Sequence, residues 1–357
     1  STSTKLAYYE DEERIFQVDL THTAAELAQY KNIPDQLPMR RKAIMDILGE
    51  KGIDPAGMDA FSAMCTGLLP MPGGVYEVGD VMYAYPMTSD NGYFLYYDSS
   101  VVSDPSTLEG VLAECEAAGK SVYMEINSGW YQTAFFFGTG CDLSYETDDQ
   151  GNFTKANVDY ASDKGLVALK KMIELKESKA FQNGSAIGEA TNVAAIVDGT
   201  WDSGAAQELF GDNYACAKLP TFQGADGNTY QMSGFGGFKL LGVKPQEDEN
   251  KLMVCDAVAY YLASEEVQLA RYNEVGWGPS NLNAQASSEV QSDVALSALA
   301  EQLAFTIPQG QYPGDYWSLA TSLGDSVISG ELTSASSDDD LMKALQDFQD
   351  TCVSYAQ

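Results

Sequence analysis

The side chains best suited to chemistry in this chain are aromatic. Three of its four tryptophans stand among glycine, serine, aspartate or other aromatic residues: Trp130, Trp201 and Trp317. An indole ring has a flat apolar face and a polar edge, so it can stack on a sugar ring while neighbouring groups bind hydroxyls. A single tryptophan serves a core equally well, but three such clusters favour a hydrated, aromatic-lined cleft. They lie far apart in the sequence, so only the fold can bring them together.

Residues for covalent or metal chemistry are few. His22 is the only histidine, so a Ser–His–Asp or Cys–His triad could form only there, and its threonine-rich surroundings favour a structural role. Asp148, Gln150 and Asn152 faintly resemble a calcium loop but lack its glycine and closing glutamate. We therefore expect no catalytic residue, no metal and no cofactor. Six cysteines show no metal-ligand spacing, and we expect most to be buried and reduced: Cys65, Cys115, Cys141, Cys216, Cys255 and Cys352.

Length and charge limit the class of protein. A chain of 357 residues predicts roughly two domains. With 52 acidic and 20 basic residues its net charge is -32, which excludes a nucleic-acid partner, disfavours an anionic ligand and favours a monomer. A neutral ligand such as a sugar suits this charge. No apolar run approaches the roughly 18–20 residues of a membrane span, and the polar start resembles a mature or trimmed terminus.

Strand and helix patterns alternate along the chain and predict an α/β protein with mainly parallel sheets. Extended segments are expected at residues 5–9, 81–86, 93–97, 122–126, 192–197, 214–219 and 238–243. Three helices are expected to begin near Thr21, Pro38 and Asp54. Further helices are expected over residues 107–119 (capped by Ser106), 162–178, 250–275, 287–303, 316–329 and 338–355. Residues 145–158 form a predicted polar loop.

Six short motifs occur in an order that is familiar from one family. They lie at residues 85–97 (YPMTSDNGYFLYY), 128–131 (SGWY), 199–201 (GTW), 218–221 (KLPT), 276–281 (GWGPSN) and 316–317 (YW). From Tyr85 onward the chain resembles the extracellular solute-binding proteins of ABC sugar importers, in particular the maltodextrin-type proteins of Gram-positive bacteria. The resemblance covers about three quarters of the chain and leaves residues 1–75 unmatched.

The resemblance implies a two-lobed, periplasmic-binding-protein-like fold of type II, in which two α/β lobes close about a hinge. The first lobe would comprise residues 1–88 and 236–308, and the second residues 89–235 and 309–357. Crossings between lobes are expected near Met87–Phe94, Gln231–Phe235 and Phe305–Gln311. Because residues 1–75 match nothing, the first lobe is expected to be reduced or rebuilt.

The family's sugar-binding positions can be carried over motif by motif. Trp130 or Tyr131, Trp201 and Trp317 correspond to stacking platforms of the second lobe. Asp90 corresponds to an acidic hydrogen-bonding group at the hinge edge, with Asn91 beside it. The remaining candidates are Asp202 and Tyr316. We expect Trp277 to be structural, because it follows Gly276, a predicted cap at the end of a helix.

The implied function is non-catalytic binding of a neutral oligosaccharide and its delivery to the membrane permease of an ABC importer. The implied location is extracellular, as a surface lipoprotein of a Gram-positive bacterium. A ligand-sensing or interaction protein with a degenerate sugar site is the alternative. A glycosidase would need two carboxylates about 5–10 Å apart. Asp90 and Asp202 could supply them, but acids are so numerous that proximity alone would mean little. The sugar stays open among α-glucans, xylo- and arabino-oligosaccharides.

Overall fold

The computed structural model describes residues 84–147, 152–244 and 247–356, together with four two-residue strands closer to the N-terminus. These are β1 (Ala7–Tyr8), β2 (Phe16–Gln17), β3 (Glu77–Val78) and β4 (Val81–Met82). β1 pairs antiparallel with β2, and β3 with β4. The helices predicted near Thr21, Pro38 and Asp54 lie outside the described residues, as do Asp148, Gln150, His22 and Cys65.

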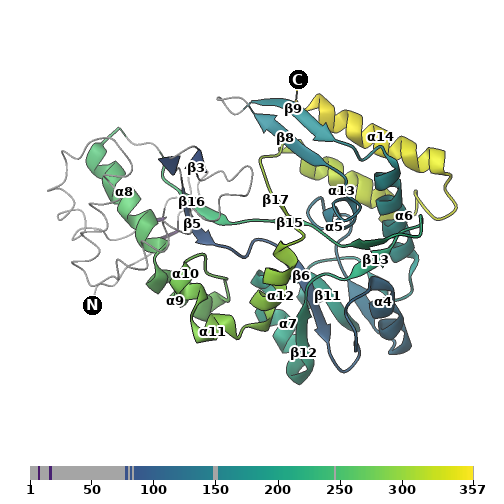
Figure 1. Ribbon diagram of the computed structural model, residues 1–357, viewed down its shortest axis with the longest axis horizontal. Helices are drawn as coiled ribbons and strands as arrows, with labels where there is room; N and C mark the ends of the chain where they lie inside the picture. The colour runs from purple at the N-terminus through teal and green to yellow at the C-terminus, as the bar shows by residue number, and fades with distance from the viewer. Residues whose placement is uncertain are drawn as a thin grey trace.

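A five-stranded sheet in the order β10-β7-β11-β6-β12 forms the centre of the larger part of the molecule (Figure 1). Its strands are β6 (Tyr93–Asp98), β7 (Ser121–Tyr123), β10 (Phe181–Gln182), β11 (Val193–Gly199) and β12 (Tyr214–Ala217). β7 runs parallel to β10 and β11, whereas β6 runs antiparallel to β11 and β12. The prediction of mainly parallel sheets is therefore wrong. Alternation of strands and helices does not reveal the direction in which β6 enters the sheet.

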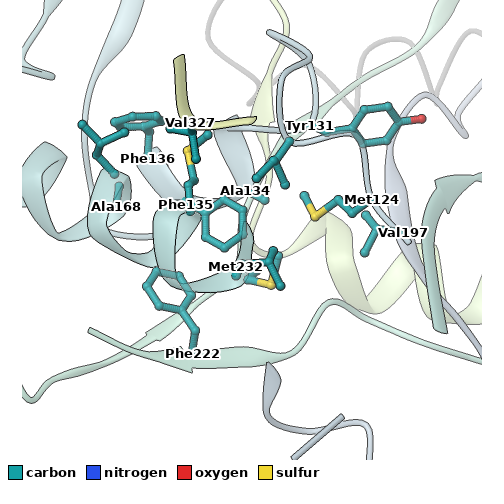
Figure 2. Packing of buried hydrophobic residues seen from close by; sticks show 14 of the residues in the cluster. Met124, Tyr131, Ala134, Phe135, Phe136, Ala168, Val197, Phe222, Met232 and Val327 are labelled. Carbon is teal, nitrogen blue, oxygen red and sulfur yellow. The ribbon is translucent and has the colours of Figure 1, made fainter. Parts of the chain in front are cut away.

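Helices cover both faces of this sheet. The larger core packs α4 (Leu108–Ala117), α5 (Thr133–Phe136), α6 (Asp163–Glu177), α13 (Asp315–Ile328) and α14 (Asp338–Ser354) with apolar residues of the strands. In Figure 2, Phe135 of α5 lies close to Phe222, and their ring centroids are 5.6 Å apart. A smaller core joins Phe94 and Ile196 of the sheet to α7 (Ser203–Phe210) and α12 (Val294–Leu303).

A second group of elements lies beyond one end of this sheet (Figure 1). It contains β5 (Ala84–Thr88), its antiparallel partner β16 (Lys239–Gly242) and α8 (Glu249–Leu262). Between the two groups, β15 (Phe235–Gly236) pairs parallel with β17 (Ile307–Pro308), and residues 89–92 connect β5 to β6. The arrangement is a two-lobed α/β fold; the expected crossings lie near these connections and stay a prediction. The exact lobe boundaries stay a prediction; α12, within the range given to the first lobe, packs on β6 and β12.

Two predicted helices are divided in the structure, and one predicted loop is a hairpin. Residues 250–275 form α8 and α9 (Glu265–Val275), because Ser264 adopts an extended conformation and caps α9 through the N–H of Val267. Likewise residues 287–303 form α11 (Ser288–Gln291) and α12, where Asp293 caps α12. The prediction of a loop at residues 145–158 is wrong, because most of these residues belong to the antiparallel strands β8 (Leu143–Thr147) and β9 (Phe153–Val158).

The remaining elements are short. They are β13 (Thr221–Gln223), β14 (Thr229–Gln231), α10 (Leu282–Gln285) and the 3-10 helices η2 (Ile187–Glu189), η3 (Thr200–Asp202) and η4 (Gly211–Asn213). The cap of α4 is Thr107, whose side chain accepts from the N–H of Gly110, and not Ser106 as predicted. Within the described ranges, no helix is both long and apolar enough to cross a membrane.

Candidate functional site

Two of the three predicted platforms come together over β15. Trp130 and Phe235 stack with centroids 5.2 Å apart and planes 30° apart, and Trp317 meets the same Phe235 edge-on at 6.3 Å. Tyr312 adds a fourth ring, 5.9 Å from Trp317. Both tryptophans are half-buried, whereas Phe235 is fully buried. The two indoles therefore keep part of their surface free above an aromatic base.

Close packing of a loop on α13 positions this cluster. A Cβ atom at Gly129 would stand 2.8 Å from Cβ of Ala320 and 3.4 Å from Cε3 of Trp317, so only glycine allows this approach. The hydroxyl of Tyr316, which is fully buried, donates to the carbonyl of Gly129 at 3.1 Å. In this conformation Tyr316 thus holds the loop of Trp130 and presents no surface to a ligand.

Trp201 lies in a second cluster, which sequence reasoning did not foresee. Its ring lies against Gly199, where a Cβ atom would be 2.2 Å from Cη2 of the indole. Nζ of Lys239 stands 5.5 Å from the centroid of Trp201 and 4.3 Å from that of Trp277. Gly276 caps α9 in the left-handed conformation, as predicted. The half-buried ring of Trp277 lies next to the same ammonium group as Trp201, and its structural role stays a prediction.

Asp90 connects the turns that carry these two tryptophans. Its Oδ2 accepts from Oγ1 of Thr200 and from the N–H of Gly278, both at 2.7 Å. Its Oδ1 lies 3.9 Å from Nζ of Lys239. Asp90 is only 1% exposed, so in this conformation it orients the turns rather than facing solvent. Asn91 beside it is half-buried, and its N–H donates to the carbonyl of Gly237 at 3.3 Å.

A buried hydrogen bond joins the loop of Trp130 to the turn of Trp201. The hydroxyl of Tyr131 donates to Oδ1 of Asp198 at 2.7 Å, and the N–H of Gly199 donates to the same oxygen at 2.7 Å. Burial raises the pKa of Asp198 to about 7; these two hydrogen bonds offset part of the rise, and the charge of half-buried Asp202 adds to it. The sequence analysis did not nominate Asp198 as a site residue, although a carboxylate near the end of a buried apolar strand is a recognisable signal.

A cavity of about 400 Å³ borders Asp90 and is lined by Ser89, Phe238 and Pro279 on one side and by α11 and α12 on the other. Another of about 710 Å³ lies away from the tryptophans, between α4, α6 and the segment before α14. In the part of the chain that the structure describes, no group of three His, Cys, Asp or Glu side chains could hold a metal ion.

Short matches link the chain to curated enzymes. It is 44% identical over 85 residues to a probable butyrate kinase of Thermotoga petrophila and 40% identical over 85 residues to one of Thermotoga maritima. Each match covers 24% of this chain, and the chain spans only about a quarter (24%) of either kinase. A likeness of that extent carries no activity over to the whole chain.

Much longer matches come from binding proteins. The ligand-free maltodextrin-binding protein MalE1 of L. casei BL23 is 22% identical with a TM-score of 0.66, over 87% of this chain and 82% of that one. The maltose-maltodextrin binding protein of Alicyclobacillus acidocaldarius is 20% identical with a TM-score of 0.63, over 80% and 76%. A complex with acarbose is 26% identical with a TM-score of 0.64, over 79% and 73%. These structures confirm the two-lobed fold.

The family model of the bacterial extracellular solute-binding proteins matches residues 22–298, and so extends into the segment 1–75 for which the motifs gave no likeness. That segment is mostly outside the described residues, so a reduced first lobe stays a prediction. The match covers well over half of the sequence, and the fold agrees with it. The chain belongs to the bacterial extracellular solute-binding protein family.

Proposed function

We propose that this protein binds a neutral oligosaccharide without chemical change and delivers it to the permease of an ABC importer from the outer surface of the cell. The observation that carries the proposal is the half-buried indole pair of Trp130 and Trp317 over Phe235. The bond from Tyr131 to Asp198 connects this pair to the turn that bears Trp201. A lipid anchor would keep the protein near the permease.

The physical chemistry of the site favours a sugar over other solutes. Pyranose C–H faces need flat aromatic partners, and hydroxyls need directional acceptors such as Asp202 and the backbone of the turns. A net charge of -32 repels anionic ligands and leaves neutral ones unaffected. Because structurally similar proteins bind maltodextrin and acarbose, α-linked gluco-oligosaccharides are the first ligands to test.

The test is a calorimetric screen of the whole chain against maltotriose, maltopentaose, xylotriose and arabinotriose. We expect saturable binding of at least one sugar and no product on prolonged incubation. Trp201→Ala should weaken binding by about 1–3 kcal/mol, or about five- to 150-fold, through lost stacking and apolar contact. Val353→Ala, which shortens an exposed side chain on α14, is the control and should leave affinity unchanged.

Two outcomes would contradict these expectations. If Trp201→Ala binds every sugar as well as the parent does, Trp201 is not a platform. If the parent binds no oligosaccharide at all, a ligand-sensing or interaction protein with a degenerate site becomes the better account.

A further inference from the structure

Lys239 holds its ammonium group against two indole rings. Nζ lies 4.3 Å from the ring centroid of Trp277 and 5.5 Å from that of Trp201, so both rings attract the cation. The rings come from separate parts of the fold, since Trp201 follows β11 and Trp277 follows α9. The lysine side chain is 27% exposed, so solvent reaches part of it and the group is not sealed into a core.

The ammonium group occupies a surface that stacking would need. A pyranose ring that packs on the face of Trp201 would take the place of the cation over that ring. We propose that Lys239 is an internal competitor: in the ligand-free protein it covers Trp201, and sugar binding displaces it. This inference rests on the proposed function, because it makes Lys239 a residue that sets the affinity of that same site.

The surroundings of Lys239 offer a place for the displaced cation. Oδ1 of Asp90 is buried, accepts no hydrogen bond from the described residues and lies 3.9 Å from Nζ. A charge-assisted hydrogen bond has a length of about 2.7–2.9 Å, so a movement of about 1 Å would create one. Pairing with Thr88 across β16 and β5 holds the backbone of Lys239 in place. Its flexible four-carbon stem can supply the whole displacement.

The first test measures sugar affinity in variants of the whole chain. Lys239→Met keeps a flexible apolar stem and removes the charge, so it should bind the sugar about two- to fivefold more tightly than the parent. Lys239→Arg keeps a cation and should give no gain. In the Trp201→Ala background, Lys239→Met should also give no gain, because the contested surface is gone. Weaker or unchanged binding by Lys239→Met would overturn the inference.

The second test needs no ligand. Urea unfolding of the parent, Lys239→Met, Trp201→Leu and the double variant should show a coupling of about two- to fivefold in the unfolding equilibrium constant. Absence of coupling means that the cation contact does not form, and the inference fails whatever the protein binds. If coupling is present but neither the parent nor Lys239→Met binds any sugar, the proposed function fails and the inference fails with it. If sugar binds and only the gain in Lys239→Met is missing, the inference alone fails.

Discussion

Replacing Asp198 by asparagine should stabilise the protein at neutral and alkaline pH. Asp198 is completely buried at the end of β11, where one oxygen accepts from both Tyr131 and Gly199. An asparagine oxygen can accept the same two hydrogen bonds, and the amide carries no charge to desolvate. The substitution therefore removes the buried charge with little change in packing.

The direction of the pH effect follows from the raised pKa. The carboxyl group titrates at an ordinary value of 3.8 in the unfolded chain and at about 7 when folded. Between these values the folded state binds more protons than the unfolded state. The stability that Asp198 contributes is therefore fully present below about pH 4 and is lost as the pH rises to about 7. Asparagine shows no such loss.

The difference between the unfolded and folded pKa of Asp198 sets an upper limit on the gain in the free energy of unfolding. A rise from 3.8 to about 7 corresponds to at most about 4 kcal/mol. Because the charge of Asp202 and the bond from Tyr131 share in the effect, we expect Asp198→Asn to raise the free energy of unfolding at pH 8 by about 1–3 kcal/mol. At pH 4 the two proteins should differ little, since the parent carboxyl is then neutral in the fold.

Urea unfolding at pH 4, 6 and 8, followed by tryptophan fluorescence, measures this difference. Asp347→Asn is the control, because it also removes one negative charge but from an exposed pair with Lys343 on α14. It accounts for the general relief of repulsion in a chain of net charge -32. If the stability of Asp198→Asn follows that of the parent in parallel across this pH range, Asp198 is ionised in the fold and the reasoning is refuted.

Two further predictions concern the scaffold. Ser264→Ala should lower the free energy of unfolding by about 1 kcal/mol, because Val267 loses the cap at the start of α9; an unchanged urea midpoint would contradict the assigned cap. The buried thiols of Cys115, Cys141 and Cys352 should react with a thiol reagent only after unfolding, because burial raises the pKa of each to about 11. Titration of the protein in urea that finds fewer than about two free thiols would refute the reduced state.

The sequence predicts elements well where one periodic pattern covers one element. The aromatic run at 93–97 became β6, and the amphipathic segments at 162–178 and 338–355 became α6 and α14 within a residue or two. It failed where apolar positions continue through a break. Ser264 and Asp293 each follow the last residues of one helix and cap the next helix, but the periodicity on both sides masked these single-residue signals.

The sequence indicates the exposure of residues with a recognisable flank, but it does not reveal contacts between residues that are distant in the chain. Glycine and serine beside Trp130 did mark a ring that remains half-exposed. The contact of Lys239 with Trp277 depends on how β16 and the end of α9 meet, which no local pattern encodes. Asp90 was nominated as a ligand group from the family motif, whereas the fold buries it between Thr200 and Gly278.

The turn of Gly199 and Thr200 is the point at which the candidate site is most constrained. The N–H of Gly199 donates to Asp198, which also holds Tyr131 beside Trp130, and the hydroxyl of Thr200 donates to Asp90. Trp201 follows directly, so its ring position depends on both buried carboxylates. Of these two carboxylates, Asp198 alone is linked to the loop of Trp130, through Tyr131. Perturbing either acid should therefore move Trp201, and sugar affinity should depend on this turn more than on any other single segment of the proposed site.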